Sequence, residues 1–139
     1  MVLTLEELFN NKEPLNNSKH DNIIKLIKNH NELSPNIKTL FNNAHYKLRR
    51  VEGEIDLLQL LYDSRAYPFI DDYHEVSPHD ATLLLFEVKT NDTTCNYHKA
   101  KKQLKKSKQL IIEHTPYYTV DCFYAFGVGN GYAWRLEKE

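Results

Sequence analysis

Residues 82–89 constrain the fold more than any other part of the chain. They include four consecutive apolar residues, 83–86, so apolar side chains fall on both faces of an extended strand. A strand with one face in water would alternate apolar and polar residues, and this one is therefore expected to lie buried between two layers. Glu87 and Lys89 place charge at the end of the same strand.

Four segments are predicted to be helical. The two longer ones, residues 18–30 and 96–113, repeat apolar residues with helical spacing. The apolar stripe of the second consists of Ala100, Leu104, Ser107 and Ile111. The two shorter ones are residues 4–10, which begin with capping-box spacing, and residues 37–41.

Strands are predicted on both sides of the central one. Their ranges are 46–51, 55–61, 119–128 and 132–136, and the first leads into a turn at Gly53. The segment from Asp63 to Asp80 contains prolines, acids and histidines and is expected to be a hairpin insertion outside the core. The order of elements predicts an α/β sandwich around a mixed sheet, and the length of 139 residues fits a single domain, residues 1–139.

Composition and charge exclude several classes of protein. No apolar run approaches membrane-spanning length, and the N-terminus lacks the basic start and apolar run of a signal peptide. An intracellular location (cytoplasmic, nucleoid or nuclear) without a membrane partner is expected, and two cysteines provide no disulfide framework. The net charge of −1 argues against a general polyanion binder, yet residues 99–108 contain six lysines.

Acidic residues and a lysine recur on two neighbouring predicted strands. Glu87 and Lys89 share a face because side chains alternate along a strand, and Glu54 and Asp56 share one by the same rule. If the strands are adjacent, Asp56 and Glu87 can meet as oxygen ligands of one hard divalent cation, with Lys89 beside it. Such a group suits metal-assisted hydrolysis of a phosphodiester.

Simpler interpretations exist for several of these residues. Glu87 and Lys89 could form an ordinary ion pair at a strand end, although the apolar strand suggests burial, where unpaired charge is rare. Glu54 could have no role other than capping the turn at Gly53. The lysines of residues 99–108 could simply form a solvated helix face. A zinc site from Cys95, His98, His114 and Cys122 lacks a second closely spaced pair, so a buried structural Cys122 is expected instead.

The order of the motifs is similar to that of a known nuclease superfamily. Residues 49–56 read Arg-Arg-Val-Glu-Gly-Glu-Ile-Asp, and residues 86–90 read Phe-Glu-Val-Lys-Thr after an insertion. A helix with Gln103 among lysines follows, and a closing strand pair contains Trp134. Over roughly two-thirds of its length the chain resembles the restriction-endonuclease-like, or PD-(D/E)XK, superfamily, especially archaeal-type Holliday junction resolvases and related small bacterial endonuclease-like proteins.

This resemblance implies a restriction-endonuclease-like α/β/α sandwich with a central mixed β-sheet, and an endonuclease dependent on Mg²⁺ or Mn²⁺. It implies a cation bound by Asp56, Glu87 and the carbonyl of Val88, with Lys89 and Gln103 completing the catalytic group. Relatives also supply an acid or a histidine from the first helix. Asp21 and His20 are the candidates here, and no spacing selects one of them.

The implied substrate is branched or duplex DNA, cut according to its structure. Cutting a junction symmetrically would require a homodimer, and the aromatic closing strands could supply its surface. The expected contacts to nucleic acid are Arg49, Arg50, Lys99, Lys102 and Lys106. Two alternatives remain: an RNA endonuclease, and an inactive nuclease-fold module that binds nucleic acid or protein.

Overall fold

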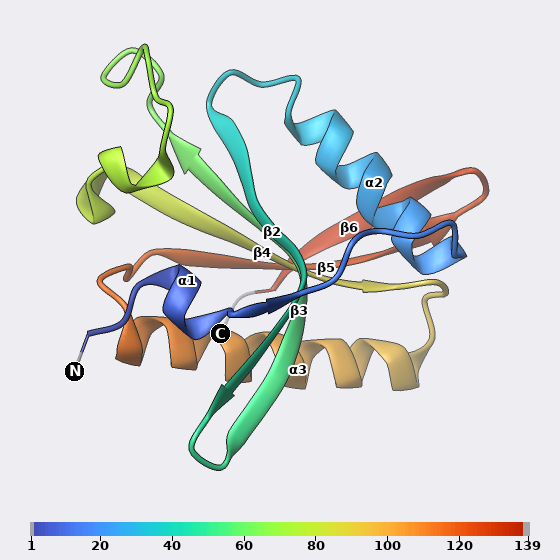
Figure 1. The fold of residues 1–139 in the computed structure, drawn as a ribbon. Coiled ribbons are helices and arrows are strands. Elements are labelled where there is room, and N and C mark those ends of the chain that lie inside the picture. Colours follow the sequence, from blue (N-terminus) through green and yellow to red (C-terminus); the bar gives the residue numbers. More distant parts are fainter. Residues whose placement is uncertain (1, 138–139) are drawn as a thin grey trace.

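A mixed β-sheet forms the centre of the molecule in the computed structural model, which describes residues 2–137 (Figure 1). Its six strands lie in the order of the sequence, β1-β2-β3-β4-β5-β6. Neighbouring strands are antiparallel except β4 and β5, which are parallel and are therefore joined by a crossover helix. The strands are β1 (Asn11–Lys12), β2 (Ile37–Leu48), β3 (Val51–Tyr62), β4 (Ala81–Lys89), β5 (Val120–Val128) and β6 (Gly131–Glu137).

Helices cover both faces of this sheet. Within residues 2–137 they are α1 (Leu5–Leu8), α2 (Lys19–Asn31) and α3 (Thr94–His114). Leu84 and Phe86 pack in the cluster formed with α2, whereas Leu83 and Leu85 pack in the cluster formed with α1 and α3. The expected α/β fold with a mixed sheet and a doubly covered central strand is confirmed. None of the helices in this range has the length and apolarity needed to cross a membrane.

The predicted elements are mostly confirmed, with errors in the region of β2 and its hairpin. Residues 37–41 form the start of β2 and not a helix, because Ile37 pairs with Leu61 of β3. The turn lies at Arg49 and Arg50 and not at Gly53, which belongs to β3. Arg49 adopts the left-handed region with a φ of 57°, which is uncommon outside glycine and asparagine.

The connection between β3 and β4 is more closely tied to the core than its composition suggests. It contains two short 3-10 turns, Tyr73–Glu75 and Pro78–Asp80. Tyr73 and Val76 are buried in the same cluster as α1 and α3. The expectation that this segment lies outside the core is wrong for these two side chains.

Candidate active site

Strands β3 and β4 separate at the point where the predicted catalytic residues lie. Their pairing ends at Leu57 and Phe86, and beyond it the backbone N–H of Val88 donates to Asp56 Oδ2 at 2.7 Å. Ile55 packs towards α3 but Leu57 packs towards α2, although they are two residues apart. Regular alternation therefore breaks at Asp56, whose carboxylate turns into the gap towards β4.

Glu87 and Lys89 lie on the α3 side of β4, since Val88 between them packs towards α2. Lys89 Nζ is 3.7 Å from Glu87 Oε1. Both Glu87 and Asp56 are only 5% exposed. Burial, and next the charge of Asp56, raise the pKa of Glu87 well above its ordinary value, while Lys89 lowers it. Two buried carboxylates thus share a site, with the Lys89 ammonium beside one of them.

His20 reaches this site from the first turn of α2. Its Nε2 donates to the carbonyl oxygen of Val88 at 3.0 Å and lies 3.5 Å from Asp56 Oδ1. Its Nδ1 is 3.0 Å from a carboxylate oxygen of Asp21. Both ring nitrogens therefore face acceptors, which favours the imidazolium. The hydrogen bond to Asp56 is the main cause that raises the pKa of His20 to about 9, against the opposing effect of burial.

Asp21 supports His20, since its Oδ1 lies 3.0 Å from His20 Nδ1. It is 4% exposed, and its Oδ2 accepts hydrogen bonds from the Asn16 backbone N–H at 2.9 Å and from the Asn43 amide at 3.2 Å. The N-cap at Ser18 fixes the first turn of α2 and so the positions of both residues. Sequence spacing left His20 and Asp21 as equal candidates, and the geometry places His20 in the site.

The oxygen atoms at the gap fit a hard divalent cation. Asp56 and Glu87 supply two carboxylates and Val88 a carbonyl, which is the donor type that Mg²⁺ and Mn²⁺ prefer. Protonated His20 already contacts Val88 and Asp56, so a cation there would compete with it. No cluster of three or more His, Cys, Asp or Glu side chains suited to a metal occurs in residues 2–137, so the carbonyl oxygen would be needed to complete the ligand set.

Gln103 lies over the strand that leads to Asp56. Its Nε2 donates to the carbonyl oxygen of Glu54 at 2.6 Å, which ties α3 to β3 two residues before Asp56. The contact requires a glycine, because a Cβ at Gly53 would lie 2.5 Å from Tyr46 Oη and 2.9 Å from Gln103 Nε2. The side chain of Glu54 is exposed and lies 3.6 Å from His45. Gln103 thus contacts the backbone of β3 next to the carboxylate site and not the carboxylates themselves.

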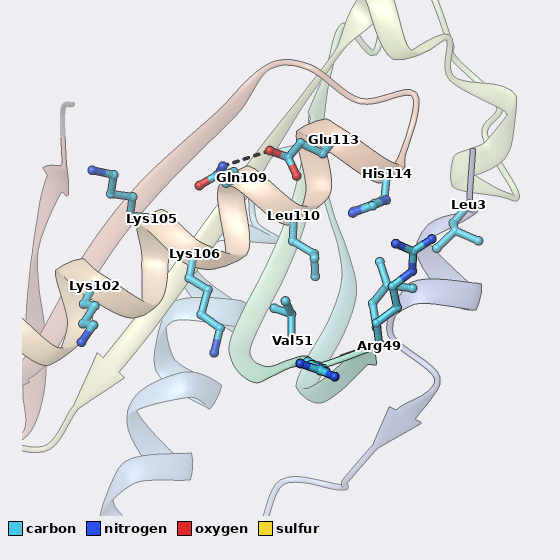
Figure 2. A pocket seen from close by; sticks show the side chains of 12 residues that line it. Leu3, Arg49, Val51, Lys102, Lys105, Lys106, Gln109, Leu110, Glu113 and His114 are labelled. Atoms are coloured by element: carbon cyan, nitrogen blue, oxygen red, sulfur yellow. Dashed lines mark hydrogen bonds between the residues drawn. The ribbon is translucent and has the colours of Figure 1, made fainter. Parts of the chain in front are cut away.

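Four of the five predicted nucleic-acid contacts line one groove between α3 and the β2–β3 hairpin. They are Arg49, Arg50, Lys102 and Lys106, and Figure 2 shows the lysines of α3 on one side and Arg49 on the other. Lys99 is not among the lining residues, and Lys105 joins them without having been predicted. Cys122 is buried in β5, as expected of a structural cysteine, and Cys95 is exposed.

Three comparisons with known proteins identified no relative of this chain. No family model matches the sequence, and neither the curated proteins nor the solved structures contain a match.

Proposed function

We propose that this protein is an endonuclease of the restriction-endonuclease-like fold that hydrolyses phosphodiester bonds in DNA with Mg²⁺ or Mn²⁺. The observation that carries the proposal is the burial of Asp56 and Glu87 where β3 and β4 separate, with Lys89 Nζ 3.7 Å from Glu87. A purely structural site gains nothing from two crowded carboxylates, whereas a cation site requires them. The order α2, β2, β3, β4, α3, β5 supports the fold assignment.

The residues have distinct roles in this proposal. Asp56, Glu87 and the Val88 carbonyl hold the cation, which when bound neutralises phosphate oxygens and makes a nearby water more acidic. Lys89 presents its ammonium group to the phosphate and offsets the charge that develops there. Gln103 fixes β3 against α3 and thereby the position of Asp56.

His20 controls the charge of the site before a cation binds. Its proton at Nε2 lies against the Val88 carbonyl and faces Asp56, the two groups that the cation needs. Binding of the cation would therefore displace this contact, and loss of the proton would assist it. The affinity for Mg²⁺ should accordingly rise with pH.

Branched DNA is the substrate we favour, on the basis of the resemblance to junction resolvases. Symmetric cuts at a junction need two active sites related by a twofold axis. Edge strand β6 offers a surface for such a dimer, since Trp134 and Leu136 are 55% and 42% exposed. The groove lined by arginines and lysines supplies contacts for the DNA backbone.

One observation favours an inactive binding module. Protonated His20 already balances part of the charge of Asp56, so the site is partly neutralised without a metal. A protein that only binds nucleic acid could use this arrangement as a structural network. Cleavage assays separate the two functions.

The decisive experiment is a cleavage panel of a four-way junction, a flap, a linear duplex and single-stranded RNA, each with Mg²⁺ or Mn²⁺. Wild-type protein should cut DNA, and Asp56→Asn and Lys89→Ala should each lower the rate by at least about a hundredfold. Asp121→Asn, an exposed acid on β5, is the matched control and should cut like the wild type. Paired symmetric nicks confined to the junction would select the resolvase, and cleavage of RNA alone the RNA endonuclease. A wild-type protein that cuts none of these substrates would refute the proposal.

A further inference from the structure

The groove between α3 and the β2–β3 hairpin has a volume of about 930 Å³. Five cationic side chains line it: Arg49, Arg50, Lys102, Lys105 and Lys106. Apolar side chains, including Val51 and Leu110, lie between the two sides (Figure 2). It lies beside the helix and strand that also carry Gln103 and Asp56.

The positive charge of this groove is available to a ligand. Among the described residues that line it, the only carboxylate belongs to Glu113, whose Oε1 accepts a hydrogen bond from Gln109 at 2.9 Å. Within residues 2–137, none of the five cations takes part in an ion pair. Because the chain as a whole has a net charge of −1, this is a local concentration of positive charge.

Side chains of α3 link the groove to the part of β3 that precedes Asp56. Lys106 donates to the carbonyl oxygen of Glu52, and Gln103 donates to that of Glu54. Lys106 also lines the adjoining groove that contains Gln103 and Glu54. Since a strand rises about 3.3 Å per residue, Asp56 and Arg50 are separated by about 20 Å along β3.

We propose that this groove binds the phosphate backbone of a duplex flank about six base pairs from the scissile phosphate. Cleavage then requires duplex of at least that length on one particular side of the cut, at a rise of about 3.4 Å per base pair. The inference rests on the proposed function. It adds two requirements to the substrate, namely duplex on one particular side of the cut and a minimum length of that duplex.

The lining favours duplex phosphates over the other polyanions. Arginine guanidinium groups match phosphate oxygens with two hydrogen bonds, and two arginines lie at the hairpin turn. Single-stranded nucleic acid is usually bound through aromatic stacking, and no Phe, Tyr or Trp lines this groove in residues 2–137. An acidic peptide would gain nothing from the position of the groove next to the strand that leads to Asp56.

Binding without cleavage tests the groove independently of the enzyme activity. Duplexes of about 8 and about 16 base pairs are titrated in EDTA with wild type and with the double variant Arg50→Gln/Lys105→Gln. The variant should bind the longer duplex at least about tenfold more weakly, with a salt slope lower by about 2. Its loss on the shorter duplex should be smaller, because a centred duplex of about 8 base pairs extends only about four base pairs to either side of the site. The control Arg65→Gln/Lys101→Gln removes the same charge outside the groove and should behave like wild type.

Cleavage then tests the polarity. On substrates whose flanks are shortened one side at a time, kcat/KM of wild type should fall about tenfold when one flank drops below about six base pairs. The groove variant should cut substrates with long and short flanks equally.

Two binding results would overturn the inference. One is equal duplex affinity of the groove variant and the control variant, and the other is a loss of affinity that is the same for short and long duplexes. The inference would also be overturned by binding of poly-glutamate that depends on Arg50 and Lys105 while duplex binding does not. If the groove variant loses duplex affinity but wild type cuts no DNA, the groove remains a duplex site and the proposed function fails.

Discussion

The imidazole of His20 faces the carboxylate of Asp56 with 3.5 Å between Nε2 and Oδ1, and the same nitrogen donates to the Val88 carbonyl at 3.0 Å. The proton on His20 therefore lies against the same oxygen atoms that would bind a divalent cation. The two positive charges are alternatives, so pH and cation concentration should act on one equilibrium.

Stability without a divalent cation should decline as the pH rises. The pKa of His20 is 6.5 when unperturbed and about 9 in the fold, so the folded protein binds this proton more tightly than the unfolded chain. Its contribution is complete below about pH 6.5 and is lost as the pH rises through about 9. Urea unfolding in EDTA between these values should give a falling free energy of unfolding, with a shallower slope for His20→Asn. His98→Asn, an exposed control, should keep the wild-type slope, and parallel curves for all three proteins would contradict the assignment.

Glu87→Gln should stabilise the fold while it abolishes activity. Burial and Asp56 raise the pKa of Glu87, so its carboxylate opposes folding once the pH exceeds the ordinary value of 4.5. Removing that charge should increase the free energy of unfolding by about 0.5–2 kcal/mol near neutral pH in EDTA, the usual range for a stabilising single substitution.

Cation addition provides the second part of this test. Mg²⁺ or Mn²⁺ should raise the melting temperature of wild type but not that of Glu87→Gln. Glu75→Gln, an exposed acid, serves as the control and should respond as wild type does. A Glu87→Gln variant less stable than wild type in EDTA would show that Glu87 has a structural role.

Gly53→Ala should be costly although glycine is not needed there for its backbone angles. The new Cβ would lie 2.5 Å from Tyr46 Oη, which shares a buried hydrogen bond of 3.1 Å with Ser107. Overpacking of this kind costs about 1–3 kcal/mol, and displacement of Gln103 should also lower the cleavage rate. Gly131→Ala is the matched change, since its nearest contact would be an ordinary 3.8 Å. Thermal unfolding compares the two, and equal losses would mean that α3 shifts freely away from β3.

The sequence predicts elements well where their periodicity is long. Residues 82–89 predict β4 because their apolar side chains fall on both faces of a strand. Residues 96–113 predict α3 because the apolar stripe from Ala100 to Ile111 repeats over several helical turns. Residues 37–41 are too few to distinguish a helix from a strand, and pairing with β3 decides the outcome. The sequence favours a turn at Gly53 over one at Arg49 because arginine is an unusual residue at a positive φ. Gly53 instead permits the close packing of β3 against Tyr46 and Gln103.

The candidate site was predictable in its composition but not in its geometry. The order of Asp56, Glu87 and Lys89 along the chain identifies acids and a lysine on adjacent strands. The separation of β3 from β4, which turns Asp56 towards Val88, arises from tertiary pairing and leaves no local signal. The choice between His20 and Asp21 likewise depends on how α2 docks on the sheet.

Trp134→Lys should convert a dimer into a monomer and uncouple its cuts. Trp134 is 55% exposed on edge strand β6, packs edge-on against Phe123 at 5.4 Å, and shares its strand face with Leu136. An edge strand with an apolar face can associate with a second copy about a twofold axis. Sedimentation of wild type should give twice the mass of one chain, and the variant should give the mass of one. On a junction, wild type should then produce paired nicks and the variant single nicks.

Phe69→Lys is the control. It changes a side chain that is 90% exposed in another segment and should preserve both the dimer and the paired nicks. A wild-type monomer at micromolar concentration that still makes paired nicks would exclude this interface.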